Sequence, residues 1–404
     1  MLHLQYRPAQ NAPMTGALDG FRIIDFSQVI AGPLSARILA DQGADVVKVE
    51  PPTGDILRHM GGIAGLSPTF ATVNRSKRSV VLDIKTPGGL ATLKKLVTEA
   101  DVFIQNARPG AADRMGVGEK TLRALNPRLI YVSVSGFGES GPFAGKRVYD
   151  PIIQGMSGMC EIQGGPAGPP GLVRVIVPDK VTALTAAQNI TAALLARERT
   201  GRGQHLKLAM LDAVIAFIWP EGMAYHTYIA DGRPKPKPVA RRDLVFKTAD
   251  GYMIASTVAL REFQGFARAA KKPEWLEDER FQNAAGLVAN AKERLEMMAE
   301  VLETRTTADW LEALDAEDVP CGPVLSRDVL HEHPQVRENA ILVEGEHPVV
   351  GRIRQPRPAE RFDDTPSAIS RPAPTLSEHA DEVLAEIGLS AAEIASLREE
   401  GATR

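Results

Sequence analysis

The feature that most constrains this chain's fold is a repeated alternation of short strand-like runs and helical runs over its first half. Residues 21–26 (FRIIDF) and 44–50 (ADVVKVE) favour strands, and the helical pattern LSARILADQGA lies between them. Further strand-like runs follow at 78–84, 101–106 and 128–138, with a helix expected from Pro87. Because such units pair their strands in parallel through right-handed crossovers, we expect an α/β core from about residue 20 to 215.

The second half of the chain has a different organisation. A Gly/Pro-rich loop at 158–171 precedes VRVIV, which predicts a strand, and then a long helix ending at Gly201. HLKLAMLDAVIAFIW predicts a further strand and a buried helix. Residues 231–243 (DGRPKPKPVARRD) are proline-rich and basic, which is typical of a crossover between domains. A hairpin turning at Asp250-Gly251 and several helices then predict a small α+β domain, and residues 377–400 predict a closing helical pair.

Composition excludes several classes of partner. With 47 basic and 50 acidic residues the net charge is −3, so no global positive field attracts nucleic acid or an anionic membrane. No apolar run reaches the roughly 18 residues that span a membrane. Two cysteines, Cys160 and Cys321, cannot form a disulfide framework, and the first fifteen residues do not have the pattern of a signal peptide. We therefore expect a cytoplasmic protein.

Two loops are candidates for ligand binding. The loop that follows the first strand is Ser27 to Pro33 (SQVIAGP), and α/β sheets bind ligands at such loops. It lacks the G-x-G-x-x-G fingerprint of dinucleotide-binding sites, so NAD is not expected. The alternative is a tight turn. Arg75, Lys77 and Arg78 cluster before a strand and, with Lys48, could contact phosphates. The alternative for this cluster is a solvated basic loop.

A third feature is Asp179, which comes just before a long helical pattern in VPDKVTAL. Aspartate is a favoured N-cap residue, and this is the simplest interpretation. The same helix dipole would keep the carboxylate ionised, so that Asp179 could act as a nucleophile without a partner base. Metal-binding histidine spacings, a G-x-S-x-G elbow and a Walker loop are all absent, and neither cysteine has a nucleophile's context. No metal is expected.

Nine blocks, taken together and in order, resemble the class III CoA-transferase family, the CaiB/BaiF-type superfamily that includes formyl-CoA transferases and alpha-methylacyl-CoA racemases. They recur over roughly residues 17 to 400, and their combination is far more specific than any one of them. The blocks are DFSQVIAGP, GADVVKVEPPTGD, NRSKRSVVLDIKTPGG, NARPGAADRMG, LNPRLIYVSVSGFGESGP, VYDPIIQGMSG, PDKVTALTA, RTGRGQHLKLAMLDA and VPCGPV.

The resemblance implies a large Rossmann-like parallel-sheet domain built from both chain ends, an inserted small α+β domain, and a homodimer of two interlocked rings. The corresponding ranges are a polar arm at 1–16, the CoA-binding domain at 17–220, a crossover at 221–243, the small domain at 244–325, and a return segment with C-terminal helices at 326–404.

The resemblance also implies roles for particular residues. Asp179 matches the family's covalent nucleophile, and Gln28 matches a polar residue beside it. Tyr149 takes the position beside the thioester. Other CoA contacts carried over by motif position fall on Val29, Leu82, Asn106, Arg114 and Arg147. Arg75, Arg78 and Lys48 are added from charge alone.

The expected activity is transfer of CoA from a donor acyl-CoA, such as succinyl-CoA, to a small carboxylic acid through an aspartyl anhydride and an aspartyl-CoA thioester. CoA is then a co-substrate. Racemases carry His-Asp where this chain has Tyr149-Asp150, and this difference favours a transferase over a racemase. The four-glycine run of oxalate-using members is absent from 220–260, which argues against formyl-CoA and oxalate as substrates. Alternatives are a racemase or isomerase using Asp150, or a CoA-binding protein without turnover. Arg241, Arg242 and His226 could pair with a second substrate carboxylate, or belong to a solvated linker.

Overall fold

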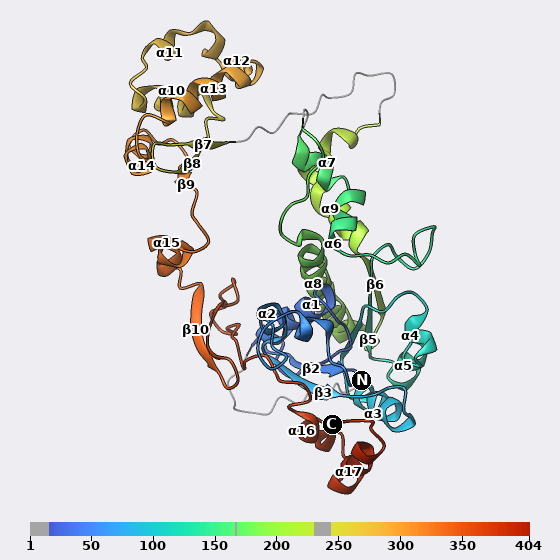
Figure 1. Ribbon diagram of the computed structural model, residues 1–404. Helices are drawn as coiled ribbons and strands as arrows, with labels where there is room; N and C mark the ends of the chain where they lie inside the picture. The colour runs from blue at the N-terminus through green and yellow to red at the C-terminus, as the bar shows by residue number, and fades with distance from the viewer. Residues whose placement is uncertain (1–15, 166–167, 230–243) are drawn as a thin grey trace. The chain divides into compact units, whose positions relative to one another are not determined.

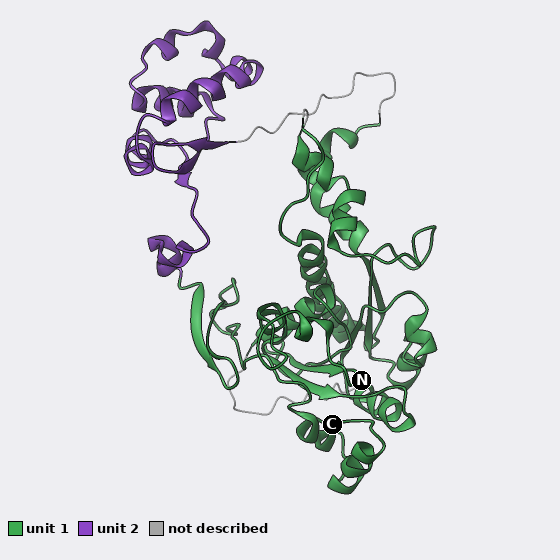
Figure 2. Cartoon of the chain, in the orientation of Figure 1, with its two compact units in different colours: residues 1–238, 340–404 green, residues 239–339 purple. Residues whose placement is uncertain are grey.

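The computed structural model describes residues 16–165, 168–229 and 244–404. These belong to two compact units, one formed by Met1–Pro238 with Ala340–Arg404 and the other by Val239–Asn339 (Figure 2). The unit inserted in the middle of the chain is longer than the small domain expected at 244–325, because it includes the start of the expected return segment. Residues 1–15 of the arm and 230–243 of the crossover, with Arg241 and Arg242, lie outside the described residues.

The first unit is built on a six-stranded parallel sheet in the order β3-β2-β1-β4-β5-β6 (Figure 1). Five of the six strands fall within runs that the sequence identified, and β3 begins one residue before its expected run at 78–84. The strand expected directly after the Gly/Pro-rich loop is not formed, because residues 171–176 are irregular. The order reverses between β1 and β4, so the loops that follow these two neighbouring strands diverge and leave a place for a ligand. The strands are β1 Arg22–Asp25, β2 Asp45–Glu50, β3 Lys77–Val81, β4 Val102–Gln105, β5 Ile130–Ser135 and β6 His205–Ala209.

Successive residues of the central strands enter two different cores, as the two-residue period of a strand requires. Ile23 of β1 packs with Ala36 and Ile190 from helices α1 and α8. Ile24, its neighbour, packs on the other face with Leu93 of α3 and Leu384 of α16. Both faces of the sheet are therefore covered, which explains why its strands are runs of apolar residues.

The helices of this unit have recognisable start and stop signals. Thr86 caps α3 by accepting the Gly89 N–H, with Pro87 at the first position, and Gly201 ends α8 in the left-handed conformation. The helices are α1 Ala31–Asp41, α2 Pro68–Asn74, α3 Pro87–Thr98, α4 Ala111–Arg114, α5 Glu119–Leu125, α6 Asp150–Met156, α7 Met159–Gly164, α8 Val177–Thr200, α9 Met210–Gly222, α16 Ala380–Glu386 and α17 Ala391–Glu399, with 3₁₀ turns η1 Ile56–His59 and η2 Ala224–His226.

The C-terminal segment completes this unit. The expected helical pair is confirmed as α16 and α17, and Arg78 of β3 forms ion pairs with Glu382 and Glu386 of α16. An antiparallel hairpin of β10 Leu342–His347 and β11 Gly351–Pro356 was not expected, because the recurring prolines from Pro348 onward indicated an irregular segment. Gly351, with φ 75°, permits the turn between its strands.

The second unit has a three-stranded antiparallel sheet in the order β7-β8-β9 and its own aromatic core, in which Phe263, Phe266 and Trp310 are fully buried. The expected hairpin at Asp250-Gly251 is confirmed. Its elements are β7 Val245–Lys247, β8 Tyr252–Ala255, β9 Cys321–Pro323, α10 Leu260–Ala269, α11 Glu274–Glu277, α12 Ala284–Ala289, α13 Ala291–Leu302, α14 Thr307–Asp315 and α15 Pro334–Glu338, with 3₁₀ turns η3 Glu279–Phe281 and η4 Leu330–Glu332.

Among the described residues, no helix combines the length and the apolar character needed to cross a bilayer.

One glycine at the start of α1 is required by a close approach. A Cβ atom added to Gly32 would lie 2.2 Å from the Ser27 hydroxyl oxygen, and the Asp25 carboxylate holds Ser27 in place. We predict that Gly32→Ala lowers the free energy of unfolding in urea by about 1–3 kcal/mol.

The matched control is Gly155→Ala, at an exposed position of α6 where an added Cβ meets no atom within 4 Å. This variant should gain about 0.5–1 kcal/mol from reduced backbone entropy of the unfolded chain. Equal stabilities for the two variants would show that the contact at Gly32 is not limiting.

Candidate active site

The loop between β1 and α1 is held in an unusual shape. Val29 has φ 70°, a conformation that β-branched residues rarely adopt and that costs about 1–3 kcal/mol. The Asn106 side chain, which follows β4, accepts the Gln28 N–H at 2.9 Å and donates to the Gln28 carbonyl at 2.7 Å. The Val29 N–H points at the Asp55 carboxylate, 3.3 Å away. These contacts join the two loops that diverge between β1 and β4.

Beneath this loop lies a network of fully buried charges. The Lys77 ammonium contacts the Asp25 carboxylate, the Pro33 carbonyl and the Asn74 side-chain oxygen, each at 2.8 Å. The Lys48 ammonium contacts Asp55 at 3.0 Å and the Ser27 carbonyl at 3.0 Å. Both lysines therefore bind backbone carbonyls of the segment that includes the loop, as well as carboxylates.

The two lysines determine the ionisation of Asp25. Burial opposes the charge on this carboxyl, but the ammonium groups of Lys77 and Lys48 outweigh it and hold the pKa of Asp25 below its ordinary value. Burial also lowers the pKa of Lys77 to about 8 despite the nearby Asp25. The network keeps an ionised carboxylate inside the protein, where an unpaired charge would be strongly unfavourable.

Asp179 lies in the first turn of α8, but it is not the N-cap of that helix. The N-cap is Ile176, whose side chain accepts no hydrogen bond. The expectation that Asp179 caps its own helix is therefore wrong. Its carboxylate instead accepts the backbone N–H of Ala31, the first residue of α1. The β1–α1 loop and the start of α8 are thereby brought together, with Asp179 between two helix N-termini.

The environment of Asp179 favours its protonated form more than the sequence suggested. Burial and the neighbouring Asp150 carboxylate raise the pKa of Asp179 to about 6, and the Ala31 N–H offsets part of this rise. At neutral pH about nine in ten molecules still carry the ionised carboxylate. A carboxylate with a raised pKa, partly buried yet accessible, is typical of a functional group.

Asp150 occupies a different environment from the one an acid/base catalyst needs. Its side chain is 3% exposed, one carboxylate oxygen accepts the Gln154 amide at 2.6 Å, and the other faces the Asp179 backbone N–H at 3.3 Å. Both oxygens are thus directed at protein donors. Exchange of a substrate α-proton by Asp150 has no support from this geometry.

Other residues expected at the site are accessible to a ligand. The side chains of Gln28, Arg114, Arg147 and Tyr149 are exposed, and Tyr149 directly precedes α6 and Asp150. Asn106 is half-buried because it holds the Gln28 backbone.

Four expected ligand contacts are placed elsewhere by the structure. Arg75 is 1% exposed and binds Asp41, Gln355 and the Pro356 carbonyl. Arg78 is buried and paired with acidic residues, and Lys48 is fully enclosed. The Leu82 side chain belongs to the core beneath α3. Neither phosphate binding nor a solvated basic loop describes this cluster, because its charges are satisfied internally.

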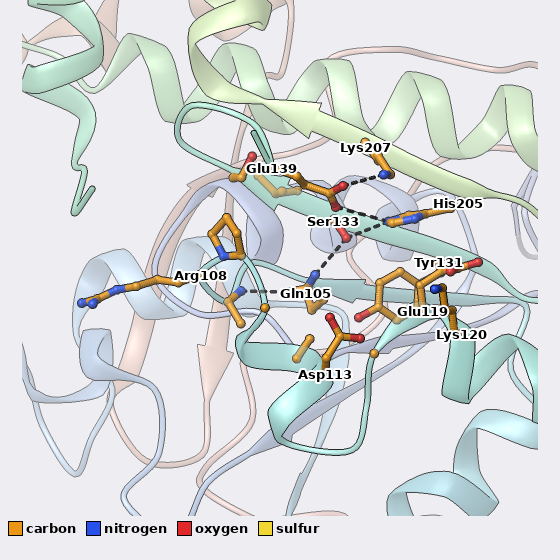
Figure 3. A pocket seen from close by; sticks show the side chains of 17 residues that line it. Gln105, Arg108, Asp113, Glu119, Lys120, Tyr131, Ser133, Glu139, His205 and Lys207 are labelled. Carbon is orange, nitrogen blue, oxygen red and sulfur yellow. Dashed lines mark hydrogen bonds and ion pairs between the residues drawn. The ribbon is translucent and has the colours of Figure 1, made fainter. Parts of the chain in front are cut away.

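A separate polar pocket of about 410 Å³ is lined by side chains of β4, β5 and β6 (Figure 3). Tyr131, which lines it, belongs to the core on the opposite face of the sheet from α1 and α8. The Gln105 amide donates to the Ser133 hydroxyl at 2.9 Å, and this hydroxyl is 2.8 Å from His205 Nε2. These three side chains come from β4, β5 and β6. None of the expected site residues lines this pocket, so we do not assign it to the Asp179 site.

Sequence reasoning missed the residues that support the loop, namely Asp25, Asp55 and Lys77 in its ion network, and the backbone N–H of Ala31. One signal was present: charged residues interrupt the otherwise apolar strand runs RIID, DVVKVE and KRSVV, whose faces are both covered. Charged residues in such strands are normally paired, which points to an internal ion network.

The cysteines and the acidic residues show no other reactive centre. Both cysteines are partly buried, and burial and Asp315 raise the pKa of the Cys321 thiol to about 11, which disfavours the thiolate. Across residues 16–165, 168–229 and 244–404, no group of His, Cys, Asp and Glu side chains is arranged to hold a metal ion.

Comparison with known proteins identifies the family. The family model described as CoA-transferase family III matches residues 18–380. The chain is 31% identical over 388 residues to a human succinyl-CoA:glutarate CoA-transferase, with 94% of this chain and 88% of the relative covered. It is 35% identical over 387 residues to a succinate–glutarate CoA-transferase of Agrobacterium fabrum, with 92% of this chain and 95% of that relative covered.

A solved structure agrees with these relatives. A CAIB/BAIF family protein from Brucella suis superposes with a TM-score of 0.81 at 32% sequence identity, covering 92% of this chain and all of that one. The α/β architecture with its six-stranded parallel sheet is thus the fold of that family protein. The chain belongs to CoA-transferase family III and is a CoA-transferase enzyme.

Proposed function

We propose that this enzyme moves CoA from a donor acyl-CoA to a small carboxylic acid, with Asp179 as the covalent nucleophile. The observation that carries the proposal is the position of the Asp179 carboxylate, partly buried and bonded to the Ala31 N–H at the start of α1. An ionised carboxylate can attack a thioester carbonyl without a general base.

Each step of the proposed reaction conserves charge and needs no proton from solvent. The Asp179 carboxylate attacks the thioester carbonyl, the carbon–sulfur bond breaks, and an acyl-aspartyl anhydride and CoA thiolate form. The thiolate attacks the aspartyl carbonyl and releases the donor acid as a carboxylate. The acceptor carboxylate then attacks the aspartyl-CoA thioester, the carbon–sulfur bond breaks, and a second anhydride and CoA thiolate form. The thiolate attacks the acceptor acyl carbonyl of this anhydride, which gives the new acyl-CoA and regenerates the Asp179 carboxylate.

The protein's own contribution is positioning and stabilisation of oxyanions. Each tetrahedral intermediate places negative charge on a carbonyl oxygen beside Asp179, where the Ala31 N–H and the exposed Gln28 amide are the donors we assign. Asn106 holds the Gln28 backbone in place through two hydrogen bonds. Preorganised donors of this kind cost no reorganisation when charge develops.

Acyl-CoA is the proposed co-substrate, and its contacts are proposed at Val29, Asn106, Arg114, Arg147 and Tyr149. Arg114 and Arg147 are exposed, so they are available to phosphate groups. We do not retain Arg75 and Arg78 as CoA contacts, and Leu82 could contribute only through its backbone.

The proposed substrates are succinyl-CoA as donor and a dicarboxylic acid such as glutarate as acceptor. The support is the naming of two relatives that match nearly the whole chain as enzymes that act on these acids. A racemase remains the second candidate by family resemblance, but the two internal bonds of Asp150 favour the transferase.

The interlocked homodimer is also proposed. Leu184 and Leu195 of α8 are 61% and 58% exposed, and Phe217 of α9 is 60% exposed. Large apolar side chains exposed on adjacent helices favour a partner surface.

The direct test is mass spectrometry of the enzyme incubated with succinyl-CoA and quenched with hydroxylamine or borohydride. Modification of Asp179 establishes the covalent route and the donor, after which glutarate and other acids are compared as acceptors. If Asp179 stays unmodified with succinyl-, acetyl- and oxalyl-CoA, while deuterium enters the acyl-CoA α-carbon without any acceptor acid, the enzyme is a racemase.

Replacement of the nucleophile should abolish transfer without loss of the fold. We predict that Asp179→Asn lowers kcat by at least about 10³-fold, because a neutral amide cannot form the anhydride. The measurement is CoA exchange between succinyl-CoA and glutarate, with CoA binding by calorimetry as the control. Near-full activity of this variant would refute the assignment of Asp179.

The same substitution should stabilise the free enzyme in a pH-dependent manner. The Asp179 carboxyl loses its proton near pH 6 in the folded protein and near 3.8 when unfolded, so between these values the folded state binds more protons and wild-type stability falls as pH rises. We therefore predict that Asp179→Asn is more stable than wild type by about 1–3 kcal/mol at pH 8, and that the difference vanishes below about pH 4.

Urea unfolding at several pH values measures this difference directly. The substituted amide can still accept the Ala31 N–H, so hydrogen bonding is matched. A variant that is less stable than wild type at every pH would contradict the proposed electrostatic cost.

A further inference from the structure

The start of α8 lacks the capping groups that a helix normally supplies for itself. Ile176 has no side-chain acceptor at the N-cap, and Pro178 has no N–H. The next residue after Pro178 is Asp179, the proposed nucleophile. Its backbone N–H is directed at the Asp150 carboxylate of α6, 3.3 Å away. A residue of another helix thus does the work of a cap at the position of the nucleophile.

Gln154 fixes Asp150 from the next turn of α6. Its amide nitrogen donates to the Asp150 carboxylate at 2.6 Å and to the Val173 carbonyl at 3.2 Å, while its amide oxygen accepts the Val173 N–H at 2.9 Å. Asp150 and Gln154 are 3% and 2% exposed. The pair therefore ties α6 both to the segment that leads into α8 and to the turn that carries Asp179.

From this geometry we propose that Asp150, held by Gln154, is a positioning residue for the reaction, which fixes the backbone of Asp179 and sets the pH range in which Asp179 attacks. The inference rests on the proposed function, in which Asp179 is the nucleophile. Asp150 acts through Asp179, since its own oxygens are occupied by protein donors.

Asp150 is the charged group that acts most strongly on Asp179 among the described residues. Burial comes first and the Asp150 charge second among the causes that raise the pKa of Asp179. The first turn of α1, whose Ala31 N–H bonds Asp179, contains no charged side chain. None of the other charged or titratable groups on the elements packed around this turn is among the causes of the raised pKa of Asp179: Lys180 of α8, Arg174, Arg37 and Asp41 of α1, Asp212 and Glu221 of α9, and His205 and Lys207 of β6.

The repulsion between the two carboxylates exists only in the free enzyme. Once Asp179 forms an anhydride or a thioester, its side chain is neutral and the repulsion disappears. Asp150 therefore makes the free carboxylate more basic and a better nucleophile, and it favours the covalent intermediate relative to the free enzyme. The same charge reduces the fraction of ionised Asp179 at low pH. The dependence of the reaction rate on pH should therefore reveal the influence of Asp150.

The test compares variants that separate charge from position. Asp150→Asn removes the charge, and Asp150→Ser is a second neutral variant with a hydroxyl that can accept the Asp179 N–H. Gln154→Met removes the clamp but leaves the Asp150 charge. Single-turnover release of succinate from succinyl-CoA, without acceptor, is measured from pH 4.5 to 9 together with the covalent species trapped on Asp179. Circular dichroism and CoA binding confirm folding.

The wild-type rate should be half-maximal near pH 6. In the neutral Asp150 variants this midpoint should fall by about 1 unit or more, and the plateau rate should fall roughly 10-fold. Gln154→Met should keep the wild-type midpoint while the rate falls at every pH, because only the position of the turn has changed. If Asp150 had only a structural role, its substitution would lower the rate without changing the pH at which the rate is half-maximal.

The outcomes distinguish this inference from the proposed function. If Asp179 is acylated in the wild type but the midpoint is the same in a folded neutral Asp150 variant, the inference is overturned and the covalent route stands. If wild-type Asp179 is never acylated, the proposed function fails, and the inference fails with it.

Discussion

The site depends on a small group of buried charges under the first loop. Asp25 stays ionised inside the sheet because Lys77 and Lys48 lie beside it, and each lysine also binds a backbone carbonyl of the segment between Ser27 and Pro33. A buried carboxylate without these partners would be unfavourable by several kcal/mol. The network therefore fixes the loop that carries Val29 in its strained conformation, and α1 begins from that loop with its Ala31 N–H bonded to the Asp179 carboxylate.

The topology of the sheet decides where this network can be useful. Since β1 and β4 are neighbours at the point where the strand order reverses, the loop after β4 can place Asn106 against the Gln28 backbone. The start of α8 reaches the same place because α8 packs beside α1 on one face of the sheet. The separate pocket under β4, β5 and β6 lies on the other face, which explains why its polar groups take no part in the arrangement around Asp179.

The sequence predicted the six parallel strands and the closing helices because each is specified locally, by apolar runs and by start signals such as Thr86-Pro87. Other features depend on contacts between distant residues, and local pattern could not reveal them. The cations around the start of β3 resemble a phosphate site by charge, yet Arg75 binds Asp41 and Arg78 binds acidic residues of α16. Asp179 resembles an N-cap by position, yet its carboxylate is bonded to another helix.

In the proposed mechanism, the raised pKa of Asp179 favours reaction at some cost in stability. A solvent-exposed aspartate at a helix start would be fully ionised at neutral pH, but it would also be weakly basic and well hydrated, both of which slow its attack on a thioester. Burial and the nearby Asp150 remove that hydration and raise the basicity, while the Ala31 N–H keeps the carboxylate mostly ionised. In the proposed mechanism these opposing effects require the loop and both helix starts to be held in place. The ion network beneath Val29 and the hydrogen bonds of Gln154 to Asp150 and Val173 would then serve the chemistry as well as the fold.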